Sequence, residues 1–101
     1  MRVVPEIIKI FNDWVNQQVV VDFPDVESGF ADQDVENIAW LRINTKQTIS
    51  GIKLWDTGDY YIEVLTLADE DPALAEFGKL PEQAILSDAF KVLFDKISEI
   101  E

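Results

Sequence analysis

The triplet Asp56-Thr57-Gly58 has the residue types and order that aspartic proteases use for catalysis. In those enzymes two such carboxylates share one proton, and a dimeric protease of the retroviral type has a chain of similar length. That chemistry needs an all-β chain and a second motif of apolar residues before glycine, and neither is found in this sequence. Aspartate and glycine are also expected in tight turns. We therefore interpret the triplet as the turn of a β-hairpin.

Closely spaced acidic residues could instead bind calcium. The run Asp32-x-Asp34-x-Glu36 resembles the start of an EF-hand loop. Its sixth position is Asn37 where glycine is required, and its twelfth is Ile43 where glutamate is required. The cluster Asp69-Glu70-Asp71 lacks calcium-loop spacing as well. We predict no metal and no cofactor.

The sequence contains no histidine and no cysteine. This excludes Ser-His-Asp and Cys-His catalysis, imidazole or thiolate metal sites and disulfides. Twenty acidic residues could still supply a carboxylate pair of the kind that hydrolyses glycosides, but 101 residues with a small sheet leave little room for a deep cleft. We predict that the protein is not an enzyme.

The acidic residues are concentrated in two tracts without lysine or arginine. The net charge is −12, and residues 22–36 contain six acids while residues 56–76 contain seven. Self-repulsion within such tracts costs stability, whereas interspersed lysines would have given solubility without that cost, so the tracts indicate binding. Complementary charge favours a basic protein partner, and it disfavours nucleic acids and anionic membranes.

The first residues lack the clean apolar run of a signal peptide, and no apolar stretch approaches transmembrane length. The absence of cysteine fits a reducing compartment. We therefore expect a cytoplasmic protein.

The elements that position these residues follow from the spacing of apolar side chains. An amphipathic helix is predicted over about residues 4–17, with Pro5 as its first residue, from the apolar positions Ile7, Ile8, Phe11, Trp14 and Val15. The β-branched valines at 19–21 fit either the end of the helix or the start of a short strand, and we favour an extended segment. Residues 22–34, which include Pro24 and Gly29, are expected to form a loop.

Three segments rich in β-branched and aromatic residues predict strands over about 35–44, 48–55 and 59–68. The turn between the last two is best fitted by a three-residue loop with Gly58 in the left-handed conformation. That register separates an apolar set from a mixed set on the other face. The apolar set is Ile52, Leu54, Tyr60, Ile62 and Val64, and the mixed set is Lys53, Trp55, Tyr61 and Glu63.

Residues 71–78 predict one helical turn that begins at Asp71 and stops at Gly78, while residues 82–86 fit either a fourth strand or an early helix. Ser87 is predicted to cap a final helix with a Lys91–Asp95 pair. Its buried stripe is Phe90, Leu93, Phe94 and Ile97. The prediction is one α+β domain over residues 1–101, with an N-terminal helix, a three-stranded antiparallel meander, a fourth strand left open, and a C-terminal helix.

Three tryptophans are present, and Trp14 lies on the apolar stripe of the first helix, so we expect it in the core. The face occupied by Trp40 is left open. Trp55 and Tyr61 lie together beside the acidic turn. They either pack against cross-strand neighbours or anchor an interface, where tryptophan and tyrosine are enriched.

After an opening amphipathic helix, two motifs carry a resemblance. They are Trp55-Asp56-Thr57-Gly58 leading into Tyr61-Ile62-Glu63-Val64-Leu65, and Ser87-x-x-Phe90-x-x-Leu93-Phe94. The pattern is similar to immunity proteins of bacterial polymorphic-toxin and contact-dependent inhibition systems, in particular the three-tryptophan TriTu kind. The resemblance implies a non-enzymatic inhibitor that binds one cognate toxin domain in the cytoplasm of the producing cell.

The leading hypothesis is therefore an immunity protein whose acidic tracts and aromatic anchors bind a basic toxin domain. The candidate partner-binding residues are Asp25, Glu27, Asp32, Asp34, Trp55, Asp56, Asp59, Tyr61, Glu63, Asp69, Glu70 and Asp71. A phage-type inhibitor or nucleic-acid mimic of a host defence nuclease is one alternative, and a self-associating structural module is another. We expect a monomer or a weak homodimer.

Overall fold

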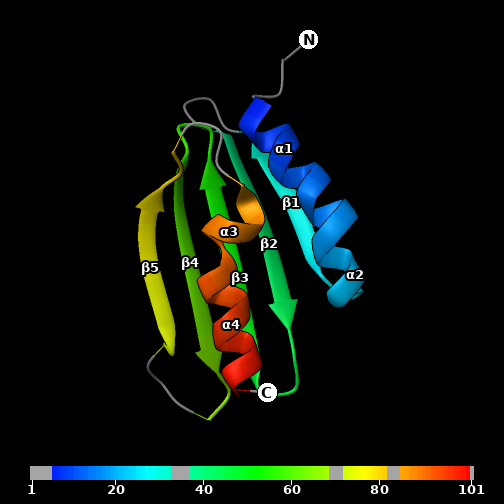
Figure 1. The fold of residues 1–101 in the computed structure, drawn as a ribbon, viewed down its shortest axis with the longest axis vertical. Coiled ribbons are helices and arrows are strands. Elements are labelled where there is room, and N and C mark those ends of the chain that lie inside the picture. Colours follow the sequence, from blue (N-terminus) through cyan, green and yellow to red (C-terminus); the bar gives the residue numbers. More distant parts are fainter. Residues whose placement is uncertain (1–5, 33–36, 69–71, 82–84, 101) are drawn as a thin grey trace.

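Helices lie on one side of a five-stranded antiparallel sheet in the computed structural model, which describes residues 6–32, 37–68, 72–81 and 85–100 (Figure 1). Each strand pairs with its neighbours in the chain, in the order β1-β2-β3-β4-β5. The strands are β1 (Glu27–Asp32), β2 (Asn37–Asn44), β3 (Thr48–Trp55), β4 (Asp59–Thr66) and β5 (Leu74–Lys79). The helical segments are α1 (Glu6–Trp14), the π-helical turn η1 (Val15–Val19), α2 (Val20–Asp22), α3 (Leu86–Ala89) and α4 (Lys91–Ile100).

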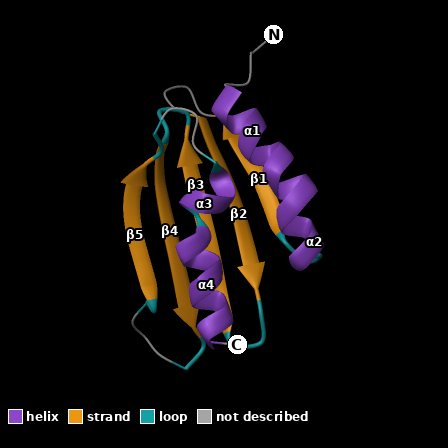
Figure 2. Cartoon of the chain, in the orientation of Figure 1, coloured by secondary structure: helices purple, strands orange, loops and turns teal. Residues whose placement is uncertain are grey.

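The core lies between the helices and one face of the sheet (Figure 2). Phe11 from α1 and Leu93 from α4 are fully buried, and so are Ile52 and Ile62 from the central strands. Trp14 is 7% exposed, which confirms its predicted place in the core. Side chains alternate along each strand, so every second one points to the other surface of the sheet, where none of the described helices lies. We call that second surface the open face.

The central hairpin has the predicted register. Ile52 pairs with Ile62 and Lys53 with Tyr61, so the apolar set faces the helices. Gly58 has φ +91°, a left-handed conformation that favours glycine, and its amide donates to the carbonyl of Trp55. The triplet Asp56-Thr57-Gly58 is therefore a hairpin turn, and the three predicted strands are confirmed as β2, β3 and β4.

The prediction that the first helix ends near residue 17 and that residues 19–21 are extended is wrong. The helical path continues through η1 and α2 to Asp22. Val15 and Val19 are both buried. The burial of these side chains outweighs the β preference of the valines. Pro5, the predicted first helical residue, lies outside the described residues.

Two further strands replace segments predicted as a loop and a helical turn, so the sheet has five strands where three, with a fourth left open, were predicted. Residues 27–32 form β1 within the predicted loop 22–34, and residues 74–79 form β5, which overlaps the predicted helical turn 71–78. Both are edge strands, and pairing with β2 and β4 fixes their conformation. Gly78 stops no helix; it pairs with Tyr60 in the sheet.

Ser87 is not the cap of the final helix. It lies inside α3, whose N-cap residue is Ile85 without a side-chain hydrogen bond. The strand alternative for residues 82–86 fails at Leu86, which begins α3, while residues 82–84 lie outside the described part. The predicted stripe of α4 is confirmed for Leu93 and Ile97, and Lys91 donates to Asp95 at 2.6 Å.

Candidate functional site

The open face is organised in rows that run across the strands. Because directly paired residues of an antiparallel sheet share a face, the pairing assigns each row. One row is mainly aromatic and crosses all five strands: Gly29, Trp40, Lys53, Tyr61 and Phe77. The next row is Glu27, Arg42, Gly51, Glu63 and Ala75. Ile49 and Leu65 pair beyond it.

The aromatic row ends in a strongly exposed ring. The ring centroids of Tyr61 and Phe77 are 4.5 Å apart, and Phe77 is 81% exposed. A phenylalanine exposed to this degree is a feature of interaction surfaces when it adjoins other apolar groups. The row thus supplies aromatic area that the helices do not cover.

Tyr61 is held by a carboxylate from the neighbouring row. Its hydroxyl donates to Glu63 Oε2 at 2.9 Å. This hydrogen bond raises the pKa of Tyr61 above its usual 10.0, with burial and the charge of Glu63 adding to the effect. The bond fixes the orientation of both side chains on the open face.

Charges on the described part of the open face are balanced, not acidic. Glu27 and Arg42 form an exposed ion pair at 3.9 Å, and Asp59 pairs in register with Lys79. Glu63 and Lys53 complete the set, which gives equal numbers of acids and bases. The net charge of −12 therefore lies largely elsewhere on the molecule.

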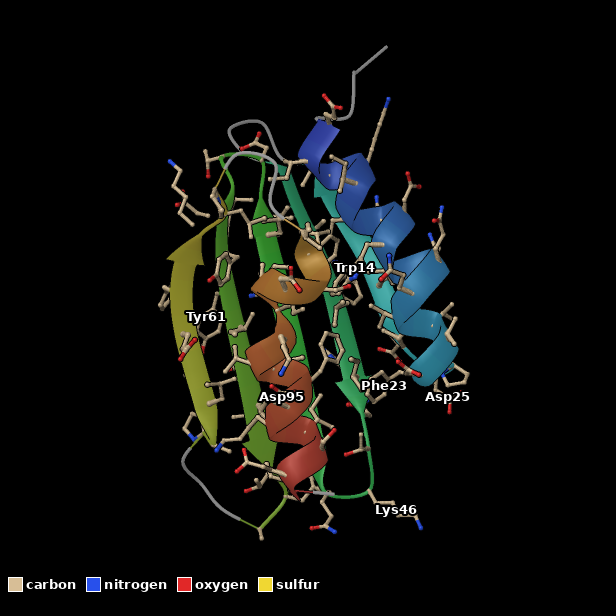
Figure 3. All side chains as sticks on the ribbon, in the orientation of Figure 1. Trp14, Phe23, Asp25, Lys46, Tyr61 and Asp95 are labelled. Atoms are coloured by element: carbon tan, nitrogen blue, oxygen red, sulfur yellow. The ribbon has the colours of Figure 1, made fainter. Side chains whose placement is uncertain are left out.

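The structure brings some of the predicted site residues together and separates others. Trp55, Tyr61, Glu63 and Glu27 share the open face, as the strand pairing requires. Asp25 lies in the turn after α2, on the far side of the molecule from Tyr61 in the view of Figure 3.

A second group of predicted residues lies at one end of the sheet. Strand β1 ends at Asp32, beside the start of β2. The start of β2 in turn lies next to the hairpin turn between β3 and β4, which contains Asp56 and is followed by Asp59 (Figure 1). The two acidic tracts therefore approach each other at this end. Asp34, Asp69, Glu70 and Asp71 lie outside the described residues.

The open face also contains a hollow that the sequence reasoning missed. It has a volume of about 560 Å³ and lies above Gly51 in the middle of β3. Its walls include Trp40, Tyr61, Ile49 and Leu65. The signal that could have found it is a glycine inside a strand, which often marks the close approach of another group.

The described residues show neither a cluster suited to a metal ion nor a helix suited to a membrane. In residues 6–32, 37–68, 72–81 and 85–100, no group of three or more acidic residues is placed to hold a metal ion. Over the same residues, no helix is long and apolar enough to span a bilayer.

Comparison with known families gives one match over nearly the whole chain. The family model described as immunity protein TriTu matches residues 4–96. No curated protein matches the chain. The matched range includes both motifs on which the resemblance was based, and the predicted resemblance is confirmed.

Proposed function

Because the chain belongs to the TriTu family of immunity proteins, we propose that it binds a cognate toxin domain and neutralises it without catalysing a reaction. The family match carries this proposal. We expect the complex to form in the cytoplasm of the cell that produces the toxin.

The open face is the surface that we assign to the toxin. Trp40, Trp55, Tyr61 and Phe77 lie on it, and aromatic side chains dominate the binding energy of many protein interfaces. The balanced charges between them suit a partner that contributes both donors and acceptors. Helices cover the opposite face, so its apolar residues serve the core.

The acidic charge has a different role in this proposal. A net charge of −12 attracts a basic toxin domain over distance and orients the encounter. Asp56 lies in the turn between β3 and β4, and Asp59 begins β4 at the same end of the sheet. We assign the steering of the partner to these carboxylates and to the predicted cluster Asp69-Glu70-Asp71, while the aromatic row holds it.

The test uses the cognate toxin domain, which we expect to be encoded by the gene immediately upstream. Co-expression should restore growth to cells that make this toxin, and calorimetry should give a complex whose affinity falls as salt rises. A toxin that this chain neither binds nor neutralises would overturn the proposal. Competition by DNA or RNA for the chain's binding site on the target would favour a nucleic-acid mimic instead.

A second candidate function, self-association, is favoured by the balanced charge of the open face. Two copies of the protein can pair through their open faces, because the balanced charges there do not add to the electrostatic repulsion between two acidic molecules. Sedimentation of the isolated protein tests this alternative. A stable dimer that is lost on Phe77→Glu would support it, and a monomer at all concentrations would rule it out.

A further inference from the structure

Three glycines lie inside strands, and the chain fills the space beside two of them with its own aromatic rings. A β-carbon at Gly29 would lie 2.6 Å from Cζ2 of Trp40, and one at Gly78 would lie 2.5 Å from the hydroxyl oxygen of Tyr60. Both glycines are on edge strands and face a ring from the adjacent strand. An aromatic ring on a strand glycine restores the packing that the missing side chain gives up.

Gly51 is the third strand glycine, and its environment differs. It lies in the central strand β3, and a β-carbon there would meet only the carbonyl oxygen of Leu41, at 3.5 Å. That distance is an ordinary contact, and the backbone of Gly51 is not in the left-handed region. Neither the backbone nor a close neighbour in the described residues therefore requires glycine at this position.

The hollow above Gly51 has apolar walls and a polar rim. Trp40 and Tyr61 line one end and Ile49 with Leu65 lines the other. Arg42 and Glu63 face each other across Gly51 in the strand pairing. Such a space suits a flat apolar group with one polar tip, which could bond to the carboxylate or the guanidinium.

We infer that an aromatic side chain of the toxin domain packs on Gly51 and fills this hollow. The inference rests on the proposed function and names the contact that anchors the complex. The chain uses an aromatic ring at each of its other two strand glycines, and the walls at Gly51 offer the same kind of surface. The volume of about 560 Å³ has room for a tryptophan or tyrosine.

Substitutions at Gly51 add side-chain atoms to the wall of the hollow, where the side chain of the toxin would otherwise pack. Gly51→Val adds a β-branched side chain that suits a strand, and Gly51→Ala adds one methyl group. The matched control is Ser98→Val, which also adds a β-branched side chain but lies at an exposed position of α4, on the side of the sheet opposite the open face. Circular dichroism and thermal melting should show all three variants folded, with Gly51→Val at least as stable as the unmodified chain.

Binding to the purified toxin domain then separates the outcomes. We expect Gly51→Val to weaken binding by roughly 30-fold or more, as for an interface hot spot, Gly51→Ala to weaken it less, and Ser98→Val to leave it unchanged. If the unmodified chain does not bind the toxin, the proposed function fails. If it binds and Gly51→Val binds equally well, this inference alone fails.

Replacement of the toxin's aromatic residues by leucine, one at a time, identifies the occupant. One such change should weaken binding to the unmodified chain and cause no further loss with Gly51→Val. Coupling to an aliphatic or basic residue of the toxin would overturn the aromatic assignment. A stable dimer of the isolated chain that Gly51→Val disrupts would instead place a second copy in the hollow.

Discussion

The indole nitrogen of Trp14 donates a hydrogen bond of 3.0 Å to the hydroxyl of Ser87, although 73 positions separate the two residues in the sequence. The hydroxyl of Ser87 in turn donates to Oε1 of Gln18 at 2.9 Å. Trp14 ends α1, Gln18 lies in the π-helical turn and Ser87 in α3, so this short chain of hydrogen bonds joins the N-terminal helical segments to α3. It also explains why Ser87 does not act as a helix cap.

Ser87→Ala should destabilise the protein by about 1–3 kcal/mol, because it leaves the N–H of the largely buried Trp14 without its partner. Urea unfolding measures the change in free energy. Ser98→Ala, at an exposed position of α4, is the control and should change stability by less than about 0.5 kcal/mol. Equal effects of the two substitutions would mean that the Trp14–Ser87 bond contributes nothing.

Ser50→Ala should stabilise the protein by about 1 kcal/mol. Ser50 is 1% exposed and its hydroxyl has no hydrogen-bond partner in the described residues. Thr48→Val is the contrast, because the hydroxyl of Thr48 is equally buried but lies 2.6 Å from that of Thr45. Thr48→Val should therefore destabilise, and a loss of stability in both variants would contradict the prediction for Ser50.

Gly58→Ala should cost about 1–2 kcal/mol, since φ +91° strains any residue with a β-carbon. Gly51→Ala is the matched control in the same hairpin and should not lower stability, because its backbone is not left-handed and its new methyl group has space. Chemical denaturation of the two variants side by side gives the comparison. A larger loss from Gly51→Ala would disprove the assignment of strain to the turn.

Glu63→Ala should lower the pKa of Tyr61 back toward 10.0, because the hydrogen bond to Glu63 is the main cause of the upward shift. The chain has two tyrosines, so a Tyr60→Phe background leaves a single phenol to titrate by ultraviolet absorbance. An unchanged titration curve would show that Glu63 does not hold the phenol.

The same pair sets a pH dependence of stability. The folded state holds the phenol proton more tightly than the unfolded state, whose pKa is near 10. The stabilisation is therefore complete below about pH 10 and is lost as pH rises through the folded pKa. In the Tyr60→Phe background, Glu63→Ala should make the loss of stability above pH 10 less steep, as measured by denaturation at several pH values.

Replacement of Asp69, Glu70 and Asp71 by Asn, Gln and Asn should slow association with the toxin domain several-fold at low salt and flatten the salt dependence of the rate. The control makes the same change in charge at the exposed residues Glu6, Asp13 and Asp88 of the helical layer. Stopped-flow mixing measures both rates. If the two triple variants slow equally, only net charge matters and the 69–71 cluster has no special part in steering.

The central hairpin could be predicted because the residues that determine its register and its turn lie in one short segment of the chain. Only one register separates Ile52 and Ile62 from Lys53 and Tyr61, and the turn supplies the glycine that this register needs. The apolar stripe of α4 was predictable for the same reason, since the spacing of Leu93 and Ile97 is visible in the sequence.

The edge strands could not be predicted in this way. Glu27–Asp32 and Leu74–Lys79 contain glycine, alanine and charged residues, and few β-branched ones. Their extended conformation comes from hydrogen bonds to β2 and β4, which lie elsewhere in the chain. Propensity along one segment carries no information about such partners.

The same cause limited the prediction of the open face. Tyr61, Trp55 and Glu63 were placed together because they belong to the predicted hairpin. Phe77 was missed because its strand was predicted to be a helical turn. Gly51 was missed because the hollow above it is formed by side chains of the neighbouring strands, which its own segment does not reveal.

The neighbour-to-neighbour order of the five strands has a consequence for folding kinetics. Every strand pair closes a short loop, so the sheet can assemble hairpin by hairpin with little loss of chain entropy at each step. The contact between Trp14 of α1 and Phe94 of α4 closes a far longer loop. An intermediate that has its sheet but lacks α4 leaves the apolar face of β3 and β4 in water, so we expect the rate of α4 docking to determine how prone the folding chain is to aggregation.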